Sequence, residues 1–247
     1  MTTTENTGRP FNLPEYFLLL ALDSGGRFRV TEHDVDMGLA GAVLADLARR
    51  GRIVVTENRV EIAEDPASIL DAGDAPEGWQ PENALEHPLD RVLLLMNDVP
   101  EPMDAEQWVN RLATRQLREV VVEALVERGA IQVKQIRRFG LLKRTRHFKN
   151  ETFYELDLKV RLGVVMNREE PLDLVTWPLL SLMHVTGLLE RLSPESRRPK
   201  ITDLLEEKYE SLESAQEKSI YESLHAVENA ISEQLVATRG GPSGLNA

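Results

Sequence analysis

A basic segment with an apolar centre is the part of this sequence best suited to bind an anionic partner. Residues 134–149, KQIRRFGLLKRTRHFK, include seven Lys or Arg residues and no Asp or Glu, whereas the formal net charge of the whole chain is -12. A basic island on an acidic protein indicates an anionic partner that is met locally. Phe139, Leu141 and Leu142 at its centre indicate an additional apolar contact, because charge attraction alone does not require them.

Three arginines upstream of this island form a second candidate site for an anion. Arg111, Arg115 and Arg118 are spaced i, i+4, i+7, which predicts that they share one face of a helix. Planar guanidinium groups on one face can hold a phosphate through paired hydrogen bonds, so we predict a lipid headgroup site here. The alternative interpretation, a solvated arginine face paired with Glu119 or an acidic loop, stays open.

Signatures of catalysis, metal binding and cofactor binding are absent from the sequence. There is no cysteine, and the five histidines lie in five separate segments without metal-ligand spacing. No P-loop, GxGxxG or nucleophile-elbow motif occurs, and Glu169 and Glu170 before Pro171 are typical of a solvated turn. We predict a protein that is not an enzyme and binds no cofactor and no metal. No stretch approaches the roughly 18 apolar residues of a spanning helix, so membrane contact would be peripheral.

The elements that must position these residues begin with a compact N-terminal unit. Pro14 starts an apolar helix that Ser24-Gly25-Gly26 ends, and a short strand is expected over residues 28–30. A second helix has apolar residues at every fourth position and ends at Gly51. A β-hairpin with the turn Thr56-Glu57-Asn58 follows. Helix, helix and hairpin together resemble a winged-helix unit.

After residue 87 the pattern is helical except around the basic island. Three consecutive helical segments are predicted between His87 and Gly129. Residues that favour strands flank the island on both sides, which predicts a β-hairpin over residues 131–157 with the island at or near its tip. Further helices are predicted over residues 158–166, 175–192, 201–212 and 217–239.

The predicted fold class is mainly α, with a helical bundle core, a winged-helix-like N-terminal unit and a projecting β-hairpin. We predict a single domain over residues 13–238, preceded by a disordered arm at 1–12. Residues 63–86 are rich in Asp, Glu, Pro and Ala and predict an acidic surface loop. Residues 239–247 predict a disordered tail.

Three segments resemble the Golgi phosphoprotein 3 family, in the family's order. Residues 38–55, GLAGAVLADLARRGRIVV, resemble its signature helix and following strand. Leu117-Arg118 followed by residues 125–129, LVERG, resembles a second family helix, and residues 184–190, HVTGLLE, resemble a third segment. The resemblance covers most of residues 14–192.

This resemblance implies a single, mostly helical domain on the cytosolic face of membranes. Eukaryotic members of the family bind phosphatidylinositol 4-phosphate, insert the tip of a hydrophobic β-hairpin and hold the tails of glycosyltransferases. In a yeast member the same hairpin forms oligomers. The family's headgroup pattern, a Trp and three Arg, falls here on Thr31, Ala40, Arg118 and Val121, so this sequence retains one of the four residue types.

The basic hairpin has four possible roles. In the first, its apolar centre enters the headgroup boundary of a membrane while its cations lie among lipid phosphates. In the second, it docks on another subunit, with the same apolar residues as anchors. The third is a solvated strand edge whose cations discourage strand pairing, and the fourth is nucleic-acid binding. Nucleic-acid binding is disfavoured because the helix that would enter a groove carries Asp34, Asp36 and Asp46.

We predict a cytoplasmic protein that is peripheral on the cytosolic membrane face and binds an anionic phospholipid, a phosphatidylinositol phosphate or another. Further expected partners are a second copy of the chain, bound through the hairpin, and a client protein; no nucleic acid is expected. The alternative is an oligomeric protein-interaction scaffold with no lipid-binding role. The residues predicted to contact the membrane or a second copy are Arg137, Arg138, Phe139, Leu141, Leu142, Lys143, Arg144 and Arg146.

Overall fold

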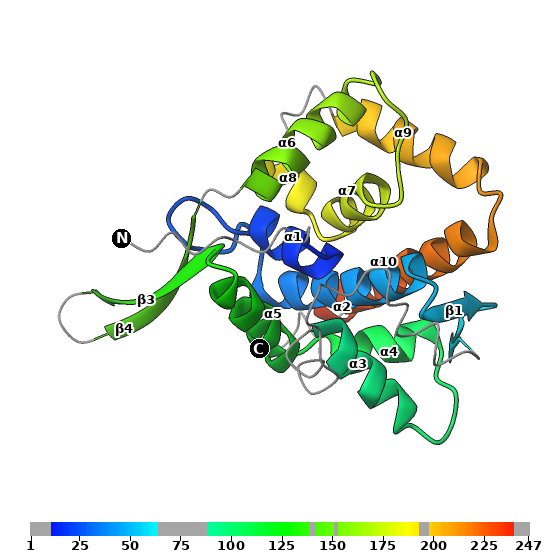
Figure 1. Cartoon of the computed structure of the whole chain (residues 1–247), viewed down its shortest axis with the longest axis horizontal. Helices are drawn as coiled ribbons and strands as arrows, with labels where there is room; N and C mark the ends of the chain where they lie inside the picture. The colour runs from blue at the N-terminus through cyan, green and yellow to red at the C-terminus, as the bar shows by residue number, and fades with distance from the viewer. Residues whose placement is uncertain (1–10, 64–87, 139–141, 151–152, 193–197, 240–247) are drawn as a thin grey trace, which may run out of the picture.

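Ten helices and two antiparallel β-hairpins make up the described part of the computed structural model, which comprises residues 11–63, 88–138, 142–150, 153–192 and 198–239. In Figure 1 the helices form the body and the second hairpin projects from it, so the predicted mainly α fold with a projecting hairpin is confirmed. The helices are α1 (Leu13–Ala21), α2 (Glu32–Arg49), α3 (Pro88–Asn97), α4 (Ala105–Leu112), α5 (Arg115–Glu127), α6 (Phe153–Met166), α7 (Thr176–Val185), α8 (Leu188–Leu192), α9 (Arg198–Glu210) and α10 (Ala215–Arg239). The strands are β1 (Ile53–Thr56), β2 (Arg59–Ile62), β3 (Ile131–Arg138) and β4 (Leu142–Lys149).

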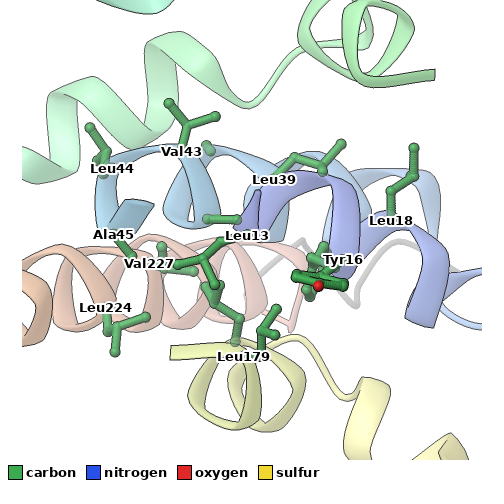
Figure 2. Packing of buried hydrophobic residues seen from close by; sticks show 14 of the residues in the cluster. Leu13, Tyr16, Leu18, Leu39, Val43, Leu44, Ala45, Leu179, Leu224 and Val227 are labelled. Atoms are coloured by element: carbon green, nitrogen blue, oxygen red, sulfur yellow. The ribbon is translucent and has the colours of Figure 1, made fainter. Parts of the chain in front are cut away.

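Helix α2 lies at the centre of the bundle. It packs most extensively against α10 and also contacts α1, α4, α5 and α7. Figure 2 shows side chains of four of these helices meeting in one core, among them Leu13, Leu39, Leu179 and Val227. Burial of these apolar side chains is the main source of the fold's stability.

The predicted winged-helix-like unit is present as α1, α2 and the β1–β2 hairpin, and it is built into the bundle. One hydrophobic cluster continues from Phe11 through Ile231. Strand β1 contacts α10, where the hydroxyl of Ser219 bonds both the N–H (3.1 Å) and the carbonyl (3.2 Å) of Val55. The N-terminal unit therefore shares its core with the C-terminal helix.

Side-chain caps fix where the first two helices begin. Asn12 accepts from the backbone N–H of Glu15 (2.8 Å), and Glu15 accepts in return from the N–H of Asn12 (2.8 Å). This reciprocal capping box also joins Thr31 and Asp34 at the start of α2. The prediction of a disordered arm up to residue 12 is wrong at its last two residues, because Phe11 packs in the core and Asn12 is the cap of α1.

The first hairpin has the two-residue turn that its strands require. Glu57 and Asn58 both adopt positive φ, 51° and 67°, as in a type I′ turn, whose twist matches that of the flanking strands. The expected strand over residues 28–30 is reduced to one isolated bridge between Leu22 and Phe28.

The second, basic hairpin ends earlier than predicted. Its register runs from Ile131 opposite Lys149 to Arg138 opposite Leu142, and the chain enters α6 at Phe153. Strand β3 begins just after the C-terminal turn of α5, so no further residues of that strand remain to pair with 151–157. A helix satisfies its own backbone hydrogen bonds, and the strand predicted there is therefore replaced by the first turn of α6.

The long helix predicted over residues 175–192 is interrupted. Helix α7 ends at Val185, and the chain turns at Gly187, which has a φ of 70°, before α8 starts at Leu188. The Thr186 hydroxyl donates to the carbonyl of Leu182 (2.6 Å) at this break. Glycine is favoured at such a left-handed position because it has no Cβ.

The other predicted helices after residue 150 are present as α6, α9 and α10. The predicted acidic loop lies outside the described residues apart from Ala63, as do residues 1–10 of the arm and 240–247 of the tail. Within the described ranges, none of the helices combines the length and apolarity needed to cross a bilayer.

Candidate functional site

A surface hollow lies at the base of the basic hairpin. Its volume is about 740 Å³, and its walls come from the segment between α1 and α2, from α5 and from the part of the hairpin nearest the body. In Figure 1 these segments lie on the side of the molecule from which the hairpin projects. Four arginines, one histidine and three glutamates supply its charged and titratable side chains: Arg27, Arg115, Arg118, Arg146, His147, Glu32, Glu119 and Glu123. The arginines make this hollow a candidate anion site.

Arg118 is the most buried cation of the hollow, with 8% of its surface exposed. Its Nη1 donates to the main-chain carbonyl of Glu32 (3.2 Å) and to Oδ2 of Asp36 (3.2 Å), and its Nη2 donates to Oε2 of Glu32 (2.7 Å). The ring of Phe28 lies 5.6 Å from the guanidinium carbon. The charge of Arg118 is therefore balanced by carboxylates of α2. Removing Arg118 would leave the buried carboxylate of Asp36 without its partner, so an alanine variant would test folding as well as binding.

The three arginines do not share one helical face, and this prediction is wrong. Helix α4 ends at Leu112, and Thr114 caps a new helix, α5, with its hydroxyl. Arg111 lies in α4, whereas Arg115 and Arg118 lie in α5. Because the helical repeat is broken between the two helices, the i, i+4, i+7 spacing does not continue across them.

The hollow contains Arg115 and Arg118 but not Arg111. Arg111 lies over the ring of Trp108, with its guanidinium carbon 5.6 Å from the ring centroid. Arg115 donates to the carboxylate of Glu119 (2.7 Å), an ion pair with both side chains exposed. For Arg115 the alternative interpretation, a solvated arginine paired with Glu119, agrees with the structure.

Two further arginines of the hollow have side chains without polar contacts to the described residues. Within the described part of the chain, the side chains of Arg27 and Arg146 have no ion pair and no hydrogen bond. Arg27 belongs to the segment between α1 and α2, and Arg146 to β4. The prediction included Arg146 only as part of the hairpin and missed Arg27. No local pattern marks Arg27, because its role depends on the hairpin packing beside it.

The hairpin is fixed to the body at His147. Its backbone N–H donates to the carbonyl of Gly26 (3.1 Å), and its ring stacks on Phe28 with centroids 5.7 Å apart. A Cβ on Gly26 would lie 3.0 Å from the backbone nitrogen of His147, and the φ of Gly26 is 70°, so glycine is required for this approach. Lys149 adds a bond from its Nζ to the carbonyl of Leu19 (3.0 Å). The contacts of His147 join the hairpin to a wall of the hollow, and the bond of Lys149 joins it to α1.

Burial and the charge of Arg118 shift the pKa values of two neighbouring groups. Burial raises the pKa of Asp36 above its ordinary 3.8, and Arg118 opposes this rise only in part. Burial lowers the pKa of His147 below its ordinary 6.5, and the nearby guanidinium of Arg118 lowers it further. Both shifts favour the neutral form of the group, as expected where charged groups are withdrawn from water.

The titration of His147 should make the free energy of unfolding depend on pH. A group whose pKa is lowered on folding stabilises the folded state above its ordinary pKa, here 6.5, and this stabilisation is lost as the pH falls through the folded value. Asp36, with a raised pKa, contributes the opposite sign. We expect His147→Phe, which keeps a ring against Phe28, to gain stability relative to the unchanged protein as the pH is lowered below 6.5. Urea unfolding across this range measures the difference, and parallel pH profiles would contradict it.

The predicted hairpin residues divide into those on strands and those at the tip. Five of them occupy strand positions of the β3–β4 ladder near its distal end: Arg137, Arg138, Leu142, Lys143 and Arg144. Phe139 and Leu141 lie outside the described residues. Nearer the base, Val133 and Ile136 are apolar and exposed, 45% and 41%. The hairpin therefore presents both cations and apolar side chains.

Three of the four family headgroup positions have other roles in this structure. Thr31 is the N-cap of α2, where its hydroxyl accepts from the N–H of Asp34 (3.1 Å). Ala40 and Val121 are both fully buried in the core. Only Arg118 borders the hollow, so any anion bound there would meet a different set of side chains.

A second hollow, of about 280 Å³, lies between β2 and the α3–α4 segment and is lined by no lysine or arginine. It does not suit an anion. Within the described ranges, no group of three or more acidic or histidine side chains is placed to hold a metal ion.

Comparison with known proteins identifies related sequences. The profile of the family described as Golgi phosphoprotein 3 (GPP34) matches residues 13–230. Vacuolar protein sorting-associated protein 74 of Eremothecium gossypii is 28% identical over 176 residues, which cover 66% of this chain and 51% of that protein. The match thus spans about half the length of this relative. The family match includes both hairpins and every residue of the hollow.

Proposed function

The chain belongs to the Golgi phosphoprotein 3 family, and we propose from this premise that it is a peripheral membrane protein that binds anionic phospholipid headgroups. The resemblance already implied such a role on the cytosolic face of a membrane. We expect no catalysis, and we expect a client protein to be held at the membrane, as the resemblance also implies. Because Thr31, Ala40 and Val121 replace the family's headgroup residues, the lipid need not be phosphatidylinositol 4-phosphate.

The observation that carries this proposal is that Arg27 and Arg146, which have no ion pair among the described residues, lie in one hollow at the base of a hairpin with seven cations. Hairpin cations near an anionic surface contribute about 1 kcal/mol each. They would attract the protein to the bilayer, and Arg27 and Arg146 would then bind one phosphate group with forked hydrogen bonds. The hollow thus adds a headgroup contact to a general surface attraction.

Vesicle flotation with the unchanged protein and Arg27→Gln/Arg146→Gln tests this proposal. We expect the unchanged protein to float with vesicles that contain phosphatidylglycerol, to stay soluble with phosphatidylcholine vesicles, and to be released at high salt. The double variant is expected to bind about 30-fold more weakly, since two cations of about 1 kcal/mol each are lost.

The matched control is Arg59→Gln/Lys218→Gln, which removes the same charge from exposed positions on β2 and α10. Its affinity should stay near that of the unchanged protein. If the unchanged protein stays soluble at every content of anionic lipid, the membrane role is wrong. If both variants lose affinity equally, the hollow has no special part in binding.

The alternative function is an oligomeric protein-interaction scaffold with no lipid-binding role. It is favoured by the exposed apolar residues Val133 and Ile136, which could dock on a second copy. Light scattering on a variant that lacks residues 137–147 separates the two functions. A fall in mass, together with no binding of the unchanged protein to anionic vesicles, would support the scaffold and assign the hairpin to assembly.

A further inference from the structure

We infer that Glu32 is a built-in competitor of the bound anion: its carboxylate occupies the position on Arg118 that an incoming phosphate oxygen would take. The inference rests on the proposed function, because it concerns the affinity of the same hollow. It names a residue that limits binding, whereas Arg27 and Arg146 promote it.

The two ends of the Arg118–Glu32 pair differ in their access to solvent. The Arg118 side chain is 9% exposed, and that of Glu32 is 71% exposed, although the two groups are only 2.7 Å apart. The guanidinium is thus held in the protein, whereas the carboxylate reaches it from the solvent side. Since both residues line the hollow, the carboxylate lies where an anion entering the hollow would meet Arg118.

The other contacts of Arg118 keep it in place without this carboxylate. Nη1 donates to the carbonyl of Glu32 and to Asp36, whose side chain is 12% exposed. These bonds involve the backbone of α2 and a largely buried group, so they do not depend on the Glu32 side chain. Nη2 bonds only the Glu32 carboxylate among the described residues. A phosphate oxygen can replace that carboxylate without disturbing the bonds of Nη1.

The exchange favours a group with more negative charge than a carboxylate. The ion pair of a carboxylate with an exposed side chain is worth at most about fivefold in affinity, so a phosphate can displace it at that cost. A phosphate monoester carries a charge of about -1.5 to -2 near neutral pH and offers three acceptor oxygens, so it can bond Nη2 and a second arginine together. The ligand chemistry is therefore a phosphate monoester, either in a lipid headgroup or free in solution.

Replacing Glu32 by glutamine tests the inference through a gain of affinity. We expect Glu32→Gln to bind vesicles that contain phosphatidylinositol 4-phosphate about tenfold more tightly than the unchanged protein. A phosphate no longer has to displace a carboxylate from Nη2, which accounts for up to about fivefold, and the hollow loses one negative charge, which accounts for the rest. The matched control is Glu123→Gln, which removes the same charge from the same hollow. Glu123 has no ion pair among the described residues, and its variant should gain less than about threefold.

Each outcome bears on the inference in a defined way. Equal gains by the two variants would show a general charge effect and overturn the competitor role, as would an unchanged or lower affinity of Glu32→Gln. If the unchanged protein and both variants fail to bind any anionic vesicle, the proposed function itself is wrong. Calorimetric titration with inorganic phosphate separates the ligand sources: a gain there as well supports a site for free phosphate, and a gain on vesicles alone supports a lipid headgroup.

Discussion

Neutralising three arginines of the basic hairpin is expected to lower the affinity for anionic vesicles about 150-fold. The variant is Arg137→Gln/Arg138→Gln/Arg144→Gln, and the estimate assumes a contribution of about 1 kcal/mol from each cation near a phosphate surface. These residues occupy strand positions near the distal end of the β3–β4 ladder, and Arg144 stands opposite Ile136 in its register. Vesicle flotation at low salt measures the change, and the difference should shrink as the salt concentration rises.

A control with the same charge separates the hairpin from the net charge of the protein. Arg59→Gln/Arg191→Gln/Lys218→Gln also removes three positive charges, from exposed residues of β2, α8 and α10. The protein is already acidic, so this control should bind slightly less well, but not by about 150-fold. Equal losses in the two variants would mean that the hairpin is not the membrane contact, and would favour the scaffold function.

Replacing Gly41 by valine is expected to lower the free energy of unfolding by about 3 kcal/mol. Gly41 lies in α2, where a Cβ would be only 2.1 Å from Cγ2 of Val227 and 2.8 Å from Cδ2 of Leu182. Both neighbours are fully buried, and valine in a helix has one strongly preferred rotamer, so Val227 cannot turn aside. The added side chain would have to push α10 and α7 away from α2. Thermal unfolding should show a midpoint about 6–12 °C lower.

Gly163→Val is the matched control, because it makes the same substitution in another helix. A Cβ on Gly163 in α6 would meet no atom within 4 Å. Valine and glycine differ little in helix propensity, so this variant should unfold within about 0.5 kcal/mol of the unchanged protein. A Gly41→Val variant of unchanged stability would contradict the tight packing of α2 against α10.

The basic hairpin is visible in the sequence, whereas the packing at Gly41 is not. Gly41 belongs to the segment GLAGAVL on which the family resemblance rests, yet the sequence gives no reason for a glycine there. The reason is the close approach of α10, whose Val227 contacts this position although it lies more than 180 residues further along the chain. Periodicity predicted that α2 is a buried helix, but not which helix packs against its glycines.

The sequence by itself determined most of the elements and some of their ends. Apolar periodicity, the caps at Thr31 and Asp104, and the turn at Glu57 and Asn58 act between residues a few positions apart, so they can be recognised locally. The basic hairpin could be predicted for the same reason, although its end could not. Strand pairing stops where the partner strand stops, and the start of β3 depends on the end of α5.

Only the tertiary structure decided which charges are available to a ligand. The spacing of Arg111, Arg115 and Arg118 predicted one arginine face, but Thr114 starts a new helix and Glu32 and Asp36, from α2, neutralise Arg118. Coulomb attraction and burial depend on distance in space, and these partners are 82 and 86 residues apart in the chain. The same packing places Arg27 and Arg146 beside one hollow with no ion pair in the described part of the chain, although they are 119 residues apart and no sequence pattern links them.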